Sequence, residues 1–364
     1  MKIVTVVGAR PQFIKAAVLS RFFQISDLVN EIVIHTGQHY DNRMSEVFFR
    51  EMGIQLAKYN LEIGSGKHGE QTGLMLAGIE KVLIHELPDY VLVYGDTNST
   101  LAGALAAAKL HIPIVHVEAG LRSFNMRMPE EINRILTDRI SEALFISSQN
   151  ARLILESEGI DSQKIFYSGD IMYDVILMFS EIAKKESQII NSLNLNDKDF
   201  ILCTFHRAEN TDNIDRLRNI LNSLEIIAKQ INVIFPVHPR TRAVLSEYNL
   251  IYPKNPNIRY IEPIGYFDML SLEANSRMIM TDSGGVQKEA YFHGKQCITL
   301  REETEWVELV QFGWNNLVSP LLPPDEIAKR VISGLQTSNI SLNKNIYGQG
   351  NAGNIIGKFF EDRA

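Results

Sequence analysis

The feature that most constrains how this chain can fold is an alternation of short apolar runs with longer helical patterns. In the first part of the chain the apolar runs, rich in β-branched residues, are 2–7, 31–36, 90–95, 113–118 and 142–148. Helical patterns lie between them, for example at 101–110. Buried strands that alternate with helices are typical of a parallel sheet, so the sequence predicts a doubly wound α/β domain.

The same alternation begins again in the second part of the chain. Its apolar runs are 199–205, 232–238, 258–263, 277–282 and 296–301. The polar tract 184–199 separates the two series, and 364 residues are enough for two domains with separate cores. We predict two Rossmann-like domains, 1–170 and 171–349. Loops at the carboxyl ends of their strands would face a cleft between the domains.

Composition and charge narrow the function classes. Hydrophobic residues make up 45% of the chain and charged residues 22%, as in soluble globular proteins. A formal net charge of -7 argues against a general nucleic-acid binder. No apolar run approaches the roughly 20 residues of a membrane span, and the start of the chain does not resemble a signal peptide. Cys203 and Cys297 lie in apolar runs and indicate buried thiols, so we expect a cytoplasmic protein.

The segment GARPQFIKA (8–16) follows the first strand and opens a helix at Pro11 and Gln12. It brings two cations, Arg10 and Lys15, to the start of the helix, although the helix dipole favours cations at the other end. Two cations at a helix N-terminus indicate a bound anion. The alternative is a solvated basic turn.

Carboxylates follow two successive strands. Asp96 ends the third strand, in YGDTNST (94–100), and Glu118 ends the fourth, in HVEAGLRSF (116–124). Asp96 could serve only as a helix N-cap. His116 and Glu118 would share one face of a strand and could form part of a metal site. No third ligand stands at a matching spacing, so we predict no metal.

A third acidic group begins the helix in MRMPEEINRILTD (126–138). Glu130 and Glu131 follow Pro129 in the first turn, and Arg134 lies one turn further on. Acids in a first turn complement the helix dipole, which is one sufficient reason for them. The functional alternative is a carboxylate base presented at the cleft, with Arg134 to orient it.

Basic residues follow strands of the second series. TFHRAENTD (204–212) places His206 at the end of one strand, and PVHPRTR (236–242) places Arg240 and Arg242 beyond the next. Either group could bind an anion. The alternatives are a structural loop histidine and simple surface charge.

The segment TDSGGVQKEA (281–290) joins a strand to a helix through Ser283, Gly284 and Gly285. Backbone N–H groups and a hydroxyl at the start of a helix form a cradle for phosphate, and Glu289 would then reach a ribose diol. A plain Gly-Gly turn is the alternative. The spacing is not that of a Walker A motif. A separate G-x-G-x-x-G match at 64–69 lacks a clear preceding strand and is a weak dinucleotide signal.

Taken in order, these motifs resemble the non-hydrolysing UDP-N-acetylglucosamine 2-epimerase family. They are GARPQFIKA, HTGQHYD, GDTNSTLAGALAA, HVEAGLRS, PEEINR, HRAEN, HPRTR and TDSGGVQKEA, and they span essentially the whole chain. The resemblance implies the GT-B architecture, with the active site between two Rossmann-like domains. A C-terminal helix, about 350–364 here, would pack back on the first domain. It also implies a UDP-sugar substrate, no metal or NAD, no nucleic-acid or membrane partner, and a homodimer.

The resemblance further implies which residues carry the function. UDP would be bound by Arg10, His206, Ser283, Gly284, Gly285 and Glu289. Catalysis and sugar positioning would fall to Lys15, Asp96, Glu118, Glu130, Arg134 and His206. The C2 proton of a 2-acetamido sugar is not acidic, so its removal must accompany cleavage of the C1–O bond to UDP. The implied route is anti elimination to 2-acetamidoglucal and UDP, followed by re-addition of UDP. The resemblance also implies a role in the biosynthesis of surface polysaccharide such as lipopolysaccharide.

One departure from the family bears on the substrate. The chain has TEWVE (304–308), where the UDP-N-acetylglucosamine enzymes carry Thr-Glu-Arg-Pro-Glu. Trp306 at that arginine position is similar to the subgroup acting on UDP-2,3-diacetamido-2,3-dideoxyglucuronate. Arg127 could then meet a sugar carboxylate, or be a surface arginine. Gln38 and His39 match the family's allosteric substrate site, whereas Asp41 differs. A GT-B glycosyltransferase is the main alternative function.

Overall fold

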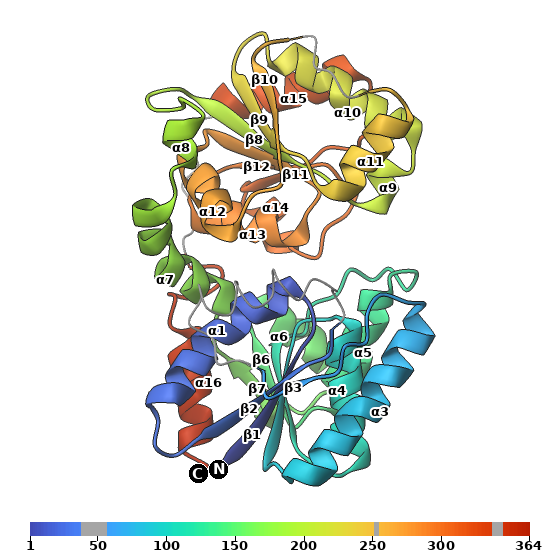
Figure 1. The fold of residues 1–364 in the computed structure, drawn as a ribbon, viewed down its shortest axis with the longest axis vertical. Helices are drawn as coiled ribbons and strands as arrows, with labels where there is room; N and C mark the ends of the chain where they lie inside the picture. The colour runs from blue at the N-terminus through green and yellow to red at the C-terminus, as the bar shows by residue number, and fades with distance from the viewer. Residues whose placement is uncertain (38–56, 251–254, 337–344) are drawn as a thin grey trace. The chain divides into compact units, whose positions relative to one another are not determined.

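The computed structural model describes residues 1–37, 57–250, 255–336 and 345–364, without the side chain of Arg10. It divides into two compact units: unit 1 consists of Met1–Val175 and Asn345–Ala364, and unit 2 of Ile176–Lys344. Each unit contains one parallel sheet with helices packed on it (Figure 1). The motif residues Gln38, His39 and Asp41 lie outside the described residues.

Unit 1 is built on a seven-stranded sheet, as far as the described residues show. Its strands are β1 (Lys2–Val7), β2 (Asn30–His35), β3 (Tyr59–Asn60), β4 (Tyr90–Tyr94), β5 (Ile114–Ala119), β6 (Ala143–Ile146) and β7 (Ile165–Tyr167). They lie in the order β3-β2-β1-β4-β5-β6-β7, with every pairing parallel. The chain direction across the sheet reverses between β1 and β4. The loops after these two strands therefore flank the topological switch point, where open α/β sheets bind ligands.

Helices cover this sheet and complete the core of unit 1. They are α1 (Arg10–Ile25), α3 (His68–Glu86), α4 (Asn98–Lys109), α5 (Pro129–Ile140), α6 (Gln149–Ser157), a 3-10 turn (Ser162–Lys164), the start of α7 (Ile171–Glu186) and α16 (Ala352–Glu361). α3 packs along α4, and α4 packs along α5. The residues between these helices and the strands are almost all Val, Ile, Leu, Met and Ala. Their burial supplies the main stabilising free energy of the unit.

The C-terminal helix α16 packs beside α1, so both ends of the chain lie in unit 1 (Figure 1). Two glycines permit the close approach. A Cβ on Gly353 would lie 2.3 Å from Val18 Cγ1, and one on Gly357 would lie 2.5 Å from the Phe22 ring. Asp174 of α7 accepts hydrogen bonds of 3.1 and 2.9 Å from the first two N–H groups of α16 and so caps that helix.

Unit 2 repeats the architecture with a six-stranded parallel sheet among its described residues. The strands are β8 (Phe200–Thr204), β9 (Asn232–Pro236), β10 (Ile258–Ile261), β11 (Met278–Thr281), β12 (Cys297–Thr299) and β13 (Asn315–Leu317), in the order β10-β9-β8-β11-β12-β13. The helices are α8 (Ile189–Ser192), α9 (Ala208–Thr211), α10 (Ile214–Ile227), α11 (Pro239–Glu247), α12 (Tyr266–Asn275), α13 (Gly284–Phe292), α14 (Val307–Gln311) and α15 (Pro324–Gln336). Its switch point lies between β8 and β11.

The prediction of two doubly wound parallel α/β domains is confirmed. Each of the predicted strands coincides with an observed strand, with ends that agree to about two residues. The sequence analysis missed β3, β7 and β13, which have two or three residues each. Such short strands carry no measurable periodicity. The polar tract 184–199 lies in unit 2, and the boundary between the units falls within α7.

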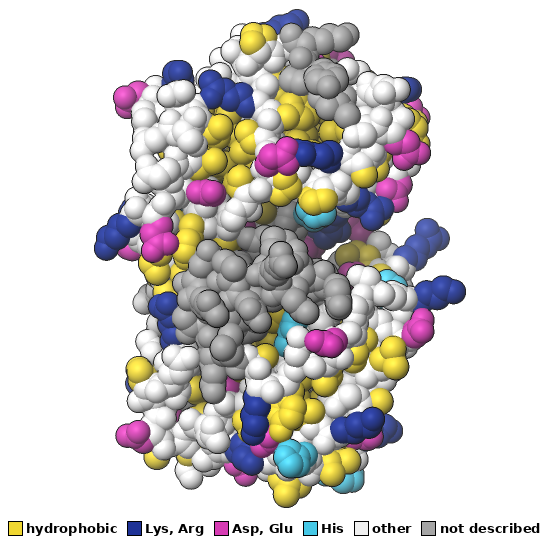
Figure 2. Space-filling model, viewed as in Figure 1, with side chains coloured by type: hydrophobic (Ala, Val, Ile, Leu, Met, Phe, Trp, Pro, Cys, Tyr) yellow, Lys and Arg dark blue, Asp and Glu magenta, His cyan; other side chains and the backbone are white. Residues whose placement is uncertain are grey.

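The surface charges and the burial of the two cysteines are as the composition and the sequence context led us to expect. None of the described helices is long and apolar enough to cross a membrane. Acidic and basic side chains are interspersed over the face shown in Figure 2. Cys203 and Cys297 are both free and buried, as predicted. Burial raises the pKa of Cys297 to about 12, so this thiol stays protonated and unreactive.

Candidate active site

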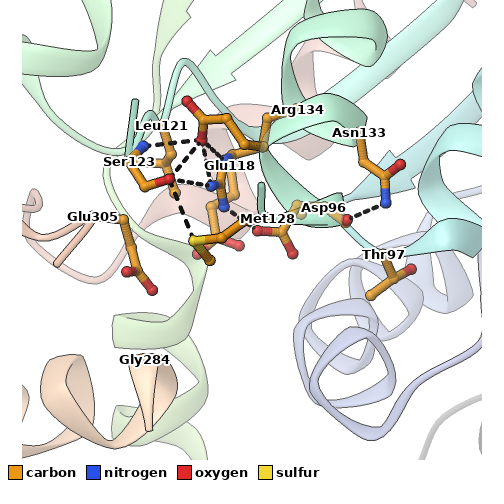
Figure 3. A network of polar contacts seen from close by, with 12 residues as sticks. Asp96, Thr97, Glu118, Leu121, Ser123, Met128, Asn133, Arg134, Gly284 and Glu305 are labelled. Atoms are coloured by element: carbon orange, nitrogen blue, oxygen red, sulfur yellow. Dashed lines mark hydrogen bonds and ion pairs between the residues drawn. The ribbon is translucent and has the colours of Figure 1, made fainter. Parts of the chain in front are cut away.

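Asp96 is held at the switch point of unit 1 by helix α5 (Figure 3). The N-cap of α4 is Thr97, whose hydroxyl accepts a 3.3 Å hydrogen bond from the Thr100 N–H. The cap is thus formed without the carboxylate of Asp96, which pairs instead with Arg134. The Asp96 carbonyl accepts a 2.9 Å hydrogen bond from Asn133. Asp96 is therefore fixed through both its side chain and its backbone.

The pKa of Asp96 shows that five predicted residues share one electrostatic cluster. Burial raises this pKa, Arg134 and Lys15 lower it, and the carboxylates of Glu118 and Glu130 raise it. The net result is a raised pKa. Asp96 consequently holds a proton more readily than an aspartate in water does, which suits a group that must donate a proton near neutral pH.

Glu118 lies in a strained turn of β5 and pairs with Lys15. The strand pairing shifts register between Val117 and Ala119, and Glu118 has φ of 71°. Its buried carboxylate contacts the Lys15 ammonium. A side chain on Gly95 would place its Cβ 3.3 Å from Glu118 Oε2. Gly95 itself has φ of 61°, so this position needs glycine for its conformation and for its space. The structure thus gives Lys15 a carboxylate partner within unit 1.

The two acids in the first turn of α5 have different environments. Glu131 is buried and accepts hydrogen bonds of 2.9 Å from the N–H groups of Ser123 and Phe124, and further ones from Arg134. Burial raises the pKa of Glu131, but the Ser123 amide and Arg134 outweigh it, so the pKa is lowered. Glu131 therefore builds the loop before α5. Glu130 is only partly buried and remains the candidate proton carrier of this turn.

His116 is hydrogen-bonded through both nitrogens of its ring. His116 Nδ1 lies 2.7 Å from Asp138 Oδ1, and Nε2 lies 2.7 Å from the Gly95 carbonyl oxygen. Both ring nitrogens are therefore used within the protein, which excludes His116 as a metal ligand in this arrangement. Within the described ranges, no group of three or more His, Cys, Asp or Glu side chains is arranged to hold a metal ion.

Gln12 joins the loops on the two sides of the switch point. Its Oε1 accepts hydrogen bonds from the N–H groups of Gly8 (2.9 Å) and Ala9 (3.1 Å). Its Nε2 donates to the Tyr94 carbonyl (3.0 Å) and to Thr100 Oγ1 (2.9 Å). The start of α1 is thereby tied to β4 and α4. The side chain of Arg10 lies outside the described residues, although α1 begins at that residue.

In unit 2, Asp282 organises the corresponding switch point. It is fully buried after β11. It accepts hydrogen bonds from the N–H groups of His206 (3.1 Å) and Arg207 (3.0 Å) and from Asn210 Nδ2 (3.0 Å). The loop after β8 is therefore anchored to the loop after β11. This anchor places His206 beside the start of α13.

The His206 side chain is partly exposed and stacks on His238, with ring centroids 4.7 Å apart. Burial lowers the pKa of His206. The nearby Asp282 carboxylate raises it, and Arg207 and Arg240 lower it, so that the net result is a lowered pKa. A neutral imidazole results at neutral pH. His206 can therefore donate one hydrogen bond to an anion, or carry a proton, but brings no fixed positive charge.

The Ser-Gly-Gly loop begins α13. Ser283 is the N-cap, and its hydroxyl makes no capping hydrogen bond with the helix. Trp306 is buried and donates a 2.9 Å hydrogen bond to the Gly284 carbonyl, while Lys288 Nζ lies 4.0 Å from the centroid of the Trp306 ring. A Cβ on Gly284 would lie 2.5 Å from Glu305 Oε1. The loop is therefore supported from within unit 2 by the TEWVE segment.

Glu289 is buried one helix turn further along α13 and contacts a second carboxyl group. Glu273 of α12 is fully buried, and the Glu289 carboxylate acts on it electrostatically. Burial and Glu289 raise the pKa of Glu273 well above its usual 4.5. Glu273 therefore holds a proton more readily than a glutamate in water does. His293 lies 3.7 Å from Glu273 Oε2, and burial lowers its pKa to about 4.

Comparison with known proteins gives one answer over the whole chain. A family model described as UDP-N-acetylglucosamine 2-epimerase matches residues 24–361. A UDP-N-acetylglucosamine 2-epimerase homolog of Methanococcus maripaludis is 56% identical over 87% of this chain and 88% of its own. The UDP-2,3-diacetamido-2,3-dideoxy-D-glucuronate 2-epimerase of Pseudomonas aeruginosa is 48% identical over 99% of both chains. The chain belongs to the UDP-N-acetylglucosamine 2-epimerase family.

Solved structures of this epimerase family agree. The UDP-GlcNAc 2-epimerase of Methanocaldococcus jannaschii, in complex with UDP-GlcNAc and UDP, has a TM-score of 0.89 and 44% identity and covers 100% of both chains. The family resemblance and the GT-B class inferred from the motifs are confirmed. Because epimerases are isomerases, the chain is an enzyme of that class.

Sequence reasoning missed several residues that support this candidate site. They are Gln12, Asn133, Asp282 and Glu305. All are polar residues next to a motif, and each binds a backbone or side-chain group far along the chain or across a tight turn. A buried polar residue with no partner nearby in sequence is a usable signal, because such a group must be hydrogen-bonded. The partner itself follows only from the fold.

Proposed function

We propose that this chain inverts C2 of a UDP-linked 2-acetamido sugar by anti elimination and re-addition of UDP. The observation that carries the proposal is the group of Asp96, paired with Arg134, and Glu118, paired with Lys15, near the switch point of unit 1, with Glu130 close enough to raise the pKa of Asp96. Proton transfer at both faces of one carbon requires more than one carboxyl group. A cluster of three provides them.

In the first step, a carboxylate of this cluster removes the C2 proton while the C1–O bond breaks. The bonding electrons of C1–O leave with UDP, and the C2–H electrons form the C1=C2 double bond of 2-acetamidoglucal. In the second step, a diphosphate oxygen of UDP adds to C1 while a carboxyl group delivers a proton to the opposite face of C2, which gives the epimer. No redox change occurs, and the proton count is restored over one cycle.

We propose that unit 2 binds the UDP group that departs and returns. Ser283, Gly284 and Gly285 offer a hydroxyl and helix N–H groups to the diphosphate, and neutral His206 adds one hydrogen-bond donor. Glu289 would accept from the ribose hydroxyls. Arg10, by family resemblance, would supply a cation. Stabilising the charge that develops on the leaving diphosphate is the main electrostatic task of this reaction.

Proton NMR in D₂O tests the reaction. We expect the enzyme to replace the C2 proton of its substrate by deuterium and to produce a manno-configured anomeric signal, without any acceptor. UDP-N-acetylglucosamine and UDP-2,3-diacetamido-2,3-dideoxyglucuronate are the two substrates to compare. If neither sugar loses its C2 proton, the epimerase proposal is wrong, and transfer to an added acceptor would then favour a GT-B glycosyltransferase.

The diacetamido uronate is the second candidate substrate because of two observations. The relative from Pseudomonas aeruginosa named for it is 48% identical over 99% of both chains. Trp306 is buried under the nucleotide loop, where the UDP-N-acetylglucosamine enzymes carry an arginine. Arg127 is exposed in the loop before α5 and would meet the sugar carboxylate. We expect Arg127→Ala to reduce kcat/KM about tenfold or more for the uronate and little for UDP-N-acetylglucosamine.

We also propose a homodimer, in accord with the family resemblance, formed through α3 and α5. Leu74 and Ile84 of α3, and Ile132 and Leu136 of α5, expose between 40% and 57% of their surface. Hydrophobic side chains are visible along α3 in Figure 2. Exposed leucine and isoleucine on the two helices that pack against α4 could form part of a dimer interface.

We propose a cytoplasmic location, because the free thiols of Cys203 and Cys297 are typical of a reducing compartment.

A further inference from the structure

We propose that His116 is a buried imidazolium that holds the Gly95 carbonyl and thereby positions the catalytic carboxylates Asp96 and Glu118. The inference rests on the proposed function, because it assigns His116 a role in that reaction. His116 is completely buried in β5 and has no access to substrate. It is therefore a positioning residue and makes no contact with the reacting atoms.

The charge of His116 follows from its two partners. Nε2 faces the Gly95 carbonyl oxygen at 2.7 Å, and a carbonyl can only accept, so Nε2 must carry a hydrogen. Nδ1 faces Asp138 Oδ1 at 2.7 Å. If Asp138 is ionised, it too can only accept. Both ring nitrogens then donate, which requires the doubly protonated ring.

Asp138 is ionised because a guanidinium and a backbone N–H donate to its other oxygen. Besides His116, its Oδ2 accepts hydrogen bonds from Arg122 Nη1 (2.7 Å) and from the Gly120 N–H (3.2 Å). Burial raises the pKa of Asp138, but His116 and Arg122 outweigh it, and the pKa is lowered. Arg122 also pairs with Glu158 through Nε and Nη2. Two cations and two carboxylates thus balance in charge behind β5, which is the condition for keeping ions buried.

This cluster reaches the loop after β4 through the bond between His116 Nε2 and the Gly95 carbonyl. Gly95 immediately precedes Asp96 and has φ of 61°, so its carbonyl is free to rotate unless something holds it. His116 holds it from the neighbouring strand. Glu118 follows two residues later, at φ of 71° and against the same glycine. The His116 ring therefore holds the loop of Asp96 beside the turn of Glu118, together with the Gly95 N–H, which donates a 3.0 Å hydrogen bond to the Val117 carbonyl.

Nitrogen NMR of the enzyme labelled with ¹⁵N-histidine tests the charge. At neutral pH we expect one histidine whose two ring nitrogens both carry protons that exchange slowly with water. This signal should vanish in His116→Asn and remain in His85→Asn, which changes an exposed histidine of α3. A His116 signal with only one protonated nitrogen would overturn the charge assignment.

Kinetics test the positioning role. His116→Asn should lower kcat for C2–H exchange about 100-fold, with kcat expressed per UDP-binding site. Its dissociation constant for UDP should stay within about threefold of the wild-type value. Asp138→Asn should act in the same direction, and His85→Asn should have no effect. His116→Gln serves if the asparagine variant does not fold. A variant that binds UDP and retains wild-type kcat refutes the inference. If the wild type itself exchanges no C2 proton, the proposed function fails, and the NMR result still decides the charge.

Discussion

At the residue scale, the candidate site works by pairing each charged group with a specific partner. The sequence predicted which residues carry charge, but it could not predict the pairs. Lys15 illustrates this. At the start of a helix it indicated a bound anion, yet the structure pairs it with Glu118, 103 residues further along the chain. The proximity arises because β1 and β5 both end at the same edge of the sheet.

Glu118→Gln should abolish most of the activity without affecting the nucleotide. The amide has nearly the same shape but cannot take up a proton, so kcat for C2–H exchange should fall by about 10² to 10⁴. UDP affinity, measured by calorimetry, should change less than threefold, because the groups proposed to bind UDP lie in unit 2 apart from Arg10. Glu70→Gln, on the exposed side of α3, is the control. Unchanged exchange would remove Glu118 from the proposed mechanism.

Glu273→Gln should stabilise the protein increasingly as the pH rises. The folded-state pKa of Glu273 is raised by burial and by Glu289. Its stabilising contribution is therefore complete below pH 4.5, the usual pKa, and is lost as the pH rises through the folded value. Glutamine does not titrate. The difference in Tm, variant minus wild type, should thus grow from pH 4.5 towards alkaline pH. Glu247→Gln, which changes an exposed residue of α11, should show no such trend. A Tm difference for Glu273→Gln that stays constant with pH would contradict the raised pKa of Glu273.

At the scale of elements, hydrophobic periodicity sufficed for every strand long enough to show it. It failed for β3, β7 and β13, because a strand of two or three residues is defined by its neighbours. Periodicity also could not show how closely helices pack. The contact between α1 and α16 joins residues over 300 positions apart, and the family resemblance, not periodicity, led us to expect that the C-terminal helix packs on the first domain.

Gly357→Ala should destabilise unit 1, although alanine is the better helix former. The new Cβ would lie 2.5 Å from the Phe22 ring, so the helices must separate, at a cost of about 1–3 kcal/mol. Gly69→Ala in α3 is the matched control, because its Cβ meets nothing within 4 Å and helix propensity then favours alanine by up to about 1 kcal/mol. Thermal unfolding should show opposite signs. A rise in Tm for Gly357→Ala would mean that α16 does not pack as described.

At the scale of the whole molecule, both units follow one rule. Several candidate site residues follow the strands β1/β4 or β8/β11 at the switch points of their own sheets, whereas Arg242 follows β9 and pairs with the exposed Glu262. The fold class was predictable because the alternation of strands and helices determines it almost alone. The supporting groups were less predictable. Gln12 and Asp282 each connect two loops, and such connections exist only once the strand order is set.

The proposed homodimer gives the last prediction, and it concerns apolar side chains of α3 and α5 that the described residues leave exposed. If α3 and α5 form the interface, Ile84→Glu with Leu136→Glu would place four carboxylates in an apolar contact between two copies. Light scattering should then give a mass of about 82 kDa for the wild type, twice the 41.2 kDa of one chain, and about 41 kDa for the variant. Ile25→Glu, at the exposed end of α1, controls for the loss of a surface isoleucine and should stay dimeric. A dimeric double variant would place the interface elsewhere, and a monomeric wild type would exclude the homodimer itself.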